Sequence, residues 1–264
     1  MRELVGPTDV SAFDNPTGGL VFPYLDSSAY RSVFDFGCGC GRVARQLIQQ
    51  DPRPERYVGI DLHPGMIRWC NQNLAPRAPG FEFHHHVVFD RFFNPTGPED
   101  DVRHFGVENQ AFTLVNAFSV FTHITQRDVA FYLGEVARIL VDDGVVHSSW
   151  FLFDKRLFPM LQEANNALYV DEVYPRAAVI FDREWVRSVA RNAGLIIYEV
   201  IPPAIRGYQW LLLMAPASSE RKEVDIPEDS GVIEHVKLPN MPEEAHRIGL
   251  GAEPKKHFMA SDTS

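Results

Sequence analysis

The sequence has few cysteines, no long apolar run and an excess of acidic over basic residues. Only 3 of its 264 residues are cysteines, too few for the disulfide framework of a small secreted protein. No stretch approaches the ~20 apolar residues that a membrane-spanning helix needs, and no apolar signal-peptide core stands near Met1. Its 25 basic residues against 35 acidic ones disfavour DNA or RNA, whose phosphates attract basic surfaces. We therefore expect a soluble, cytoplasmic protein without nucleic-acid or membrane partners, and its oligomeric state stays open.

Short apolar runs and longer amphipathic stretches alternate along residues 31–214. The apolar runs predict strands, and the stretches with helical spacing predict helices between them. This order predicts an α/β fold, with a doubly wound, mainly parallel sheet covered on both faces. The last two strands, 195–201 and 207–214, are joined too closely for a parallel crossover and should be antiparallel. The other predicted elements are strands at 32–36, 57–60, 81–89, 112–118 and 145–153 and helices at 42–50, 64–74, 128–140 and 183–192.

Three segments do not follow this alternation. Residues 1–30 are rich in turn-forming residues and predict a lid or loop segment over the main domain, 31–214. Residues 154–179 resemble an insertion within that domain, and we expect it on the acceptor side of a site. Residues 215–264 are polar and show no sustained period, which predicts a flexible tail. Because binding loops vary on a rigid scaffold, we expect 1–30, 91–106 and 154–179 to set specificity.

A glycine-rich bend follows the first predicted strand. Glycines at 37, 39 and 41 let the backbone turn sharply and approach a ligand, and the following helix points its free N–H groups at that ligand. Asp61 ends the second strand, where its carboxylate can accept both hydroxyls of a ribose. The pattern D-x-G-x-G-x-G places Arg42 where a dinucleotide fingerprint would have its last glycine. The spacing therefore predicts a nucleoside site at the carboxyl ends of parallel strands.

At these positions the chain resembles the class I S-adenosylmethionine-dependent methyltransferases. The resemblance covers roughly residues 30–214 and implies a seven-stranded, mainly parallel Rossmann-like sheet with an antiparallel last strand. It also implies that S-adenosylmethionine is the cofactor and that the enzyme is a transferase. Four motifs in order carry the resemblance, namely Val33–Arg42, Gly59–Asp61, Leu114–His123 and Glu135–Leu140 with the following Asp142–Gly144.

The resemblance further implies which residues bind the cofactor. The glycines of the bend and Cys38 would line the methionyl part, and Asp35 would help to organise that end. Asp61 would hold the ribose. The full set implied is Asp35, Gly37, Cys38, Gly39, Gly41, Asp61, Leu62, Met66, Asp90, Asn116 and Phe118.

The remaining members of this set would contact the adenine and the sulfonium. Leu62 and Met66 would lie against the adenine. The family often places an acidic residue after the third strand to meet the adenine amino group, and Asp90 is the nearest acid here. Asn116 and Phe118 would face the sulfonium from the fourth strand.

Methyl transfer is an in-line displacement, so alignment of the acceptor supplies much of the acceleration. A hydroxyl acceptor also needs its proton removed. His123 is a candidate base just past the fourth strand, and the alternative is a structural role at the start of the next helix. His147 in the fifth strand is the other candidate, and the alternative is a buried strand residue. The run His84–His86 does not predict a metal site, because successive strand residues point to opposite faces.

The sequence favours a methyltransferase that acts on a small-molecule acceptor, with oxygen as the acceptor atom. Sugar-containing or other natural-product intermediates fit the lack of nucleic-acid and membrane features. Two alternatives stay open. Arg42 and the antiparallel closing strand weigh against an NAD-dependent oxidoreductase, and the intact glycine bend with Asp61 weighs against a non-catalytic binding module.

Overall fold

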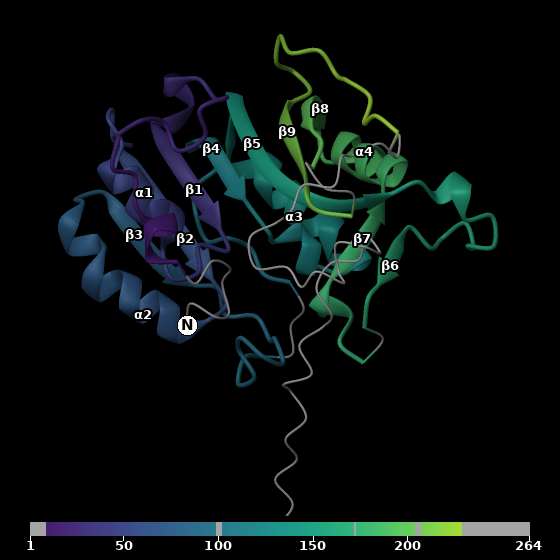
Figure 1. Ribbon diagram of the computed structural model, residues 1–264, viewed down its shortest axis with the longest axis horizontal. Helices are drawn as coiled ribbons and strands as arrows, with labels where there is room; N and C mark the ends of the chain where they lie inside the picture. The colour runs from purple at the N-terminus through teal and green to yellow at the C-terminus, as the bar shows by residue number, and fades with distance from the viewer. Residues whose placement is uncertain (1–8, 99–101, 172, 204–206, 229–264) are drawn as a thin grey trace, which may run out of the picture.

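The computed structural model describes residues 9–98, 102–171, 173–203 and 207–228 (Figure 1). The first 8 residues of the predicted lid segment and residues 229–264 of the predicted tail lie outside the described residues. Within the described part, no helix is long and apolar enough to cross a membrane.

The described strands form one mixed sheet. Along the order β3-β2-β1-β4-β5 every neighbouring pair is parallel. β9 then pairs antiparallel with β5 and with β8. The nine strands are β1 (Ser32–Phe36), β2 (Arg56–Asp61), β3 (Phe81–His85), β4 (Phe112–Ala117), β5 (Leu140–Phe153), β6 (Ala167–Tyr169), β7 (Val179–Asp182), β8 (Leu195–Ile201) and β9 (Trp210–Pro216). The α/β fold with a reversed last strand is therefore confirmed.

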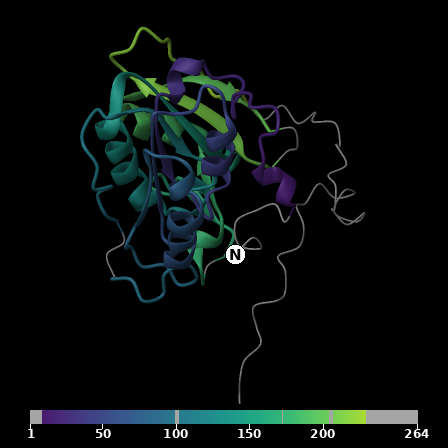
Figure 2. The same cartoon turned by 90° about the vertical axis from the view of Figure 1, so that its left-hand side faces the viewer.

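Helices cover both faces of this sheet. Alternate residues of β1 point to opposite sides, so Val33 packs in one core cluster and Phe34 in the other. The cluster with Val33 includes residues of α1 (Arg42–Gln49) and α2 (Pro64–Asn73), together with part of the N-terminal segment. The cluster with Phe34 includes residues of α3 (Gln126–Ile139) and α4 (Arg183–Asn192). Figure 2 shows α3 (teal) and the N-terminal segment (purple) on opposite sides of the sheet, as a doubly wound fold requires.

The sheet has two strands more than the predicted seven. The segment 154–179, expected to be an insertion, contains β6, and β7 begins at its end. β5 is long enough to change partners, since Val146–Trp150 pair with β9 and Phe151–Phe153 pair with β7. Strands as short as β6 and β7 give too few residues for an alternating pattern to be recognised.

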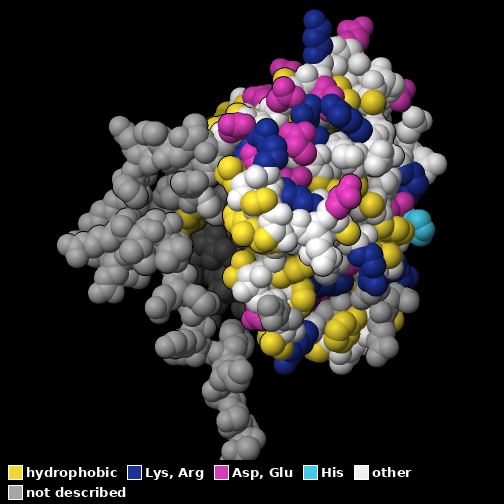
Figure 3. All heavy atoms as spheres, turned by 90° about the vertical axis from the view of Figure 1, so that its right-hand side faces the viewer, with side chains coloured by type: hydrophobic (Ala, Val, Ile, Leu, Met, Phe, Trp, Pro, Cys, Tyr) yellow, Lys and Arg dark blue, Asp and Glu magenta, His cyan; other side chains and the backbone are white. Residues whose placement is uncertain are grey.

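Part of the predicted tail is packed on the domain. Ala215 and Pro216 still belong to β9, and the side chain of Ile226 is only 4% exposed in the cluster with α4. Arg183 Nη1 donates a hydrogen bond to the Pro227 carbonyl oxygen at 2.7 Å, and Arg191 pairs with a glutamate of the same segment, Glu223. Acidic and basic side chains are interspersed over this side of the molecule (Figure 3). The flexible tail predicted from residue 215 therefore does not begin there.

Candidate active site

The bend between β1 and α1 lies against the end of β2. Gly37, Gly39 and Gly41 have φ angles of 79°, 56° and 76°, which residues with a Cβ rarely adopt. The Gly37 N–H donates to the Ile60 carbonyl oxygen at 2.8 Å, and the Gly39 N–H donates to Asp61 Oδ2 at 2.8 Å. The predicted bend and the predicted acid are therefore in direct contact at the tips of neighbouring strands.

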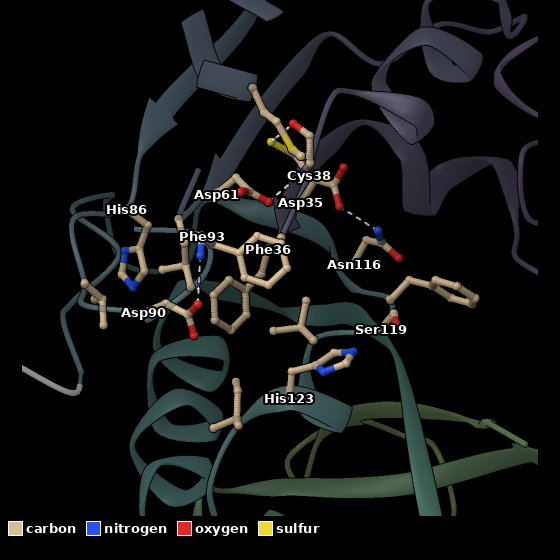
Figure 4. Close-up of a pocket in the computed structure, with 18 of the residues that line it drawn as sticks. Asp35, Phe36, Cys38, Asp61, His86, Asp90, Phe93, Asn116, Ser119 and His123 are labelled. Atoms are coloured by element: carbon tan, nitrogen blue, oxygen red, sulfur yellow. Dashed lines mark hydrogen bonds between the residues drawn. The ribbon is translucent and has the colours of Figure 1, made fainter. Parts of the chain in front are cut away.

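A cavity of about 500 Å³ opens at the carboxyl ends of β1, β2 and β4 (Figure 4). This volume falls within the ~300–1,000 Å³ of small-molecule sites. Gly41 is the one predicted cofactor residue that does not line it, since a Cβ there would point at Cys70 and Leu74 behind the bend. The predicted residues that do line it are Asp35, Gly37, Cys38, Gly39, Asp61, Leu62, Met66, Asp90, Asn116 and Phe118.

Backbone N–H groups hold both carboxylate oxygens of Asp61. Oδ1 accepts from the His63 N–H and Oδ2 from the Gly39 N–H, each at 2.8 Å. Burial raises the pKa of Asp61, and these hydrogen bonds counteract the rise. Each carboxylate oxygen has a second lone pair. The carboxylate is therefore fixed in orientation and can still accept hydroxyl donors from a ligand.

Asp35 carries a buried carboxylate beside the bend. Its residue is 2% exposed, and the Tyr57 hydroxyl donates to Oδ2 at 2.6 Å while Asn116 Nδ2 donates to Oδ1 at 2.6 Å. Burial raises the pKa of Asp35 to about 6, against the opposing effect of the two hydrogen bonds. Asp35 is therefore ionised at neutral pH and places a negative charge at the methionyl side of the predicted site.

His147 lies behind the cavity wall. It is 0% exposed and does not line the cavity. Its Nδ1 bonds Asn116 Oδ1 at 2.7 Å, and its Nε2 bonds the Tyr24 hydroxyl at 2.8 Å. Burial lowers the pKa of His147 to about 4. With both ring nitrogens engaged and no route to a ligand, His147 does not fit the predicted role of general base.

His123 lies in the cavity wall, on the 3-10 turn Phe121–His123 between β4 and α3 (Figure 4). Its Nδ1 is 3.0 Å from the Arg176 carbonyl oxygen. Because a carbonyl only accepts, Nδ1 carries the proton and Nε2 has a free lone pair for a ligand proton. The alternative, a helix-capping role, is not seen: α3 takes Thr125 as its N-cap residue, without a side-chain capping bond.

The segment predicted as an insertion supplies two wall residues, Tyr174 and Arg176. The Tyr174 hydroxyl donates to Asp90 Oδ2 at 2.9 Å, and the Phe93 N–H donates to Asp90 Oδ1 at 2.9 Å. Arg176 forms an ion pair with Asp128, 3.2 Å between Nη2 and Oδ2. Asp90 therefore faces the cavity, and hydrogen bonds hold its carboxylate in a turn. The lid role predicted for 91–106 and 154–179 stays a prediction.

Ser119 lines the cavity in a conformation that no sequence pattern indicated. Its φ angle is 59°, in the left-handed region that favours glycine. Its N–H donates to Ser149 Oγ at 2.6 Å, and its Oγ accepts from Gln209 Nε2 at 3.0 Å. Contacts from β5 and from the chain before β9 thus hold Ser119 just after the carboxyl end of β4. Only the assembled sheet brings these positions together.

The three successive histidines at the end of β3 each contact a different group. His84 lies beside Glu82 at 3.0 Å, His85 Nε2 is 2.9 Å from the Leu62 carbonyl oxygen, and His86 Nε2 is 3.1 Å from the Tyr132 hydroxyl. Among the described residues, no group of three His, Cys, Asp or Glu side chains is arranged to hold a metal ion.

Residues 33–144 match a protein family described as a methyltransferase domain. The matched range contains the glycine bend, Asp61, Asn116 and His123. Residues 33–144 therefore form a methyltransferase domain, and this match supports the class I S-adenosylmethionine-dependent methyltransferases as the family. S-adenosylmethionine is therefore the cofactor of this methyltransferase, and the NAD-dependent alternative is not supported.

Similar solved structures have low sequence identity, and one of the three that follow has a TM-score above 0.5, which shows the fold alone. An O-methyltransferase family protein from Burkholderia thailandensis is similar at 17% identity, with a TM-score of 0.51, 72% of this chain and 52% of that chain being covered. The methyltransferase thus spans about half the length of that protein. An S-adenosylmethionine-dependent methyltransferase from Methanosarcina mazei has 16% identity, a TM-score of 0.49 and coverage of 72% and 93%. A TehB-like methyltransferase from Corynebacterium glutamicum has 16% identity, a TM-score of 0.46 and coverage of 71% and 80%.

Proposed function

We propose that the methyltransferase transfers a methyl group to a hydroxyl oxygen of a small molecule, with His123 as the general base. One observation carries this proposal: His123 lies in the cavity wall with its Nδ1 proton committed to the Arg176 carbonyl oxygen. The remaining nitrogen, Nε2, is the atom that can accept a proton from a bound hydroxyl.

The cofactor would occupy the part of the cavity between β1 and β2. Asp61, fixed by two backbone N–H groups, would accept the ribose hydroxyls. The bend from Gly37 to Gly39 would lie along the methionyl part, because its glycines leave no Cβ in the way. Met66 and Leu62 supply apolar wall beside Asp61 and would contact the adenine.

The reaction needs alignment and removal of one proton. S-adenosylmethionine supplies a methyl group whose carbon–sulfur bond breaks, with the electron pair going to sulfur, as the acceptor oxygen bonds the methyl carbon. His123 Nε2 takes the proton from that oxygen, so that the oxygen's lone pair attacks. Phe118 and Val120 flank the end of β4 in the cavity and would exclude water from the transfer path.

The acceptor would be a hydroxylated molecule with flat apolar surface, such as a sugar-containing or aromatic natural-product intermediate. The wall combines the aromatic rings of Phe93, Phe118 and Tyr174 with the polar groups of Gln209 and Arg176. Apolar walls with a few placed polar groups are typical of small-molecule sites. Tyr174 and Arg176 come from the segment between β6 and β7, which would make that segment a specificity element.

The test is the turnover of a His123→Asn variant. Asparagine can still donate to the Arg176 carbonyl oxygen from its side-chain nitrogen but has no basic nitrogen. With a panel of phenolic and sugar-containing acceptors, we expect S-adenosylhomocysteine formation to fall by ~10²–10⁴-fold. Cofactor affinity by calorimetry should stay unchanged, and His84→Asn on β3 should keep full turnover. Full activity of His123→Asn would refute the role of His123.

A further inference from the structure

A chain of hydrogen bonds runs from the N-terminal segment to Asp35. The Tyr24 hydroxyl bonds His147 Nε2 at 2.8 Å, and His147 Nδ1 bonds Asn116 Oδ1 at 2.7 Å. Asn116 Nδ2 then donates to Asp35 Oδ1 at 2.6 Å. Three elements distant in sequence, the N-terminal segment, β5 and β4, are therefore linked through this chain to the Asp35 carboxylate near the end of β1. Figure 4 shows the last link, between Asn116 and Asp35.

The direction of every bond in this chain follows from the acid at its end. An ionised carboxylate only accepts, so Asn116 must turn its nitrogen to Asp35 and its oxygen to His147. His147 must then carry its proton on Nδ1, which leaves Nε2 to accept from the Tyr24 hydroxyl. All the donors point toward Asp35. The hydroxyl of Tyr24, by donating to Nε2, stabilises this tautomer of His147 and, through it, the orientation of the Asn116 amide.

The ring of His147 also contacts two aromatic rings. The Phe22 ring stacks on it with 4.1 Å between centroids, and the Phe118 ring is parallel to it within 11° at 6.1 Å. Phe22 belongs to the N-terminal segment, whereas Phe118 lines the cavity. The same histidine therefore joins the N-terminal segment to the cavity wall by packing as well as by hydrogen bonds.

We propose that Tyr24 and His147 are positioning residues, which hold the Asn116 amide so that it supports the ionised Asp35 carboxylate at the methionyl end of S-adenosylmethionine. The N-terminal segment then supports the cofactor site from the face of the sheet that α1 covers, although none of its described residues lines the cavity. This inference rests on the cofactor arrangement in the proposed function. The ligand group concerned is the cationic part of the cofactor, its ammonium and sulfonium, which a buried carboxylate attracts.

The charged and titratable groups around the chain fit this role. Arg42 lowers and Asp61 raises the pKa of Asp35, and the hydroxyl of Tyr57 supports its other oxygen. Burial and the charge of Glu199 raise the pKa of Tyr24 to about 12, so that it remains a donor at neutral pH. Because His147 stays neutral down to about pH 4, Asp35 is the first member of the chain to change charge as the pH falls from 7.

The experiment compares Tyr24→Phe with wild type in S-adenosylmethionine binding, measured by calorimetry from pH 5 to pH 8. Wild-type affinity should decline as Asp35 is protonated near pH 6. Without the tyrosine hydroxyl, His147 Nε2 loses its hydrogen-bond donor, so the tautomer and the Asn116 orientation that support the ionised Asp35 become less stable. We expect the midpoint of the decline to move up by about 0.5–1 unit, which is about a three- to tenfold weaker Kd at the low-pH end. At pH 8 the two proteins should bind alike.

Three controls separate this role from a merely structural one. Tyr169→Phe removes a hydroxyl from a tyrosine of equal exposure, 40%, and should leave the profile unchanged. Asp35→Asn should bind weakly and without pH dependence in this range, which identifies the titrating group. His147→Phe keeps the stacked ring and loses the donor, whereas His147→Gln restores a donor, so the glutamine variant should bind closer to wild type.

Two outcomes would overturn the inference. One is an identical pH profile for Tyr24→Phe and wild type. The other is a loss of affinity by the same factor at every pH, which indicates packing only. Failure of the wild-type protein to bind S-adenosylmethionine at any pH would instead contradict the cofactor site itself, and unaltered turnover of His123→Asn would contradict only the proposed base.

Discussion

Gly41 and Gly134 show how position decides what a glycine contributes. Gly41 caps α1 with a φ of 76°, and a Cβ there would run into Leu74 and Cys70. Gly134 lies on the exposed face of α3, and a Cβ there would meet nothing within 4 Å. The same substitution to alanine should therefore have opposite effects at the two sites.

Gly41→Ala should destabilise the protein by about 1–2 kcal/mol, because a left-handed residue with a Cβ is strained and two buried side chains must move. It should also weaken S-adenosylmethionine binding by displacing the start of α1. Gly134→Ala should stabilise by about 0.5–1 kcal/mol, since glycine in a helix interior carries that cost relative to alanine. Urea unfolding of both variants measures whether the free energy of unfolding falls or rises. A Gly41→Ala variant as stable as wild type would contradict the strain argument.

Local patterns in the sequence located the glycine bend and Asp61 but not Ser119 and Gln209, which also line the cavity. Gly37, Gly39 and Asp61 share a local spacing that identifies a strand end and a neighbouring strand end. Ser119 and Gln209 have no such spacing: they meet across 90 positions of chain, 3.0 Å apart. Contacts of that kind depend on the registers of β4, β5 and β9, which no local pattern contains.

At the scale of elements, the segment 217–228 behaves as part of the domain. The Val224 N–H donates to the Ile197 carbonyl oxygen of β8 at 2.8 Å, and Ile226 packs in the core cluster that includes α4. Two of its acidic residues are paired with arginines of α4, 2.7 Å from Arg187 to Asp225 and from Arg191 to Glu223. A polar segment with one buried side chain has no hydrophobic period, so its sequence resembles that of a mobile tail.

Ile226→Ala should lower the free energy of unfolding by about 2 kcal/mol, the low end for truncation of a buried aliphatic side chain. Val224, which is 37% exposed, is the matched control. Val224→Ala should change the free energy of unfolding by less than about 0.5 kcal/mol. Chemical denaturation of both variants gives the comparison. Equal stability of the Ile226→Ala variant and wild type would show that the segment does not stabilise the fold.

At the scale of the whole molecule, two buried histidines and two buried acids contribute to the response to acid. Burial lowers the pKa of His86 and of His147 to about 4 from an ordinary 6.5, so their protonation favours the unfolded chain. Their contribution to stability is present above pH 6.5 and is lost as the pH falls toward 4. Asp35 has the opposite effect on stability. Its pKa is about 6 in the folded protein, compared with an ordinary value of 3.8, so its protonation on acidification favours the folded state.

Burial also raises the pKa of Asp61, so its protonation likewise favours the folded state, and the two histidines are the groups whose burial should lower stability as the pH falls from 6.5 to 4. Thermal melts in a pH series measure it. His86→Phe, which removes one histidine while filling the same space beside Phe36 and Tyr132, should show a shallower decline than wild type. Equal declines in the melting temperature of His86→Phe and of wild type would contradict the contribution of His86.

The sequence by itself determined the order of strands and helices, the reversed closing strand, and the bend with Asp61, because each depends on hydrophobic period or on residues close along the chain. The tertiary structure decided the rest: that β5 changes partners and admits β6 and β7, that His147 is buried while His123 faces the cavity, and that Tyr24 reaches Asp35 through two other side chains. These outcomes depend on which strands become neighbours and in what register, and a strand's face and partners are fixed only when the sheet is assembled.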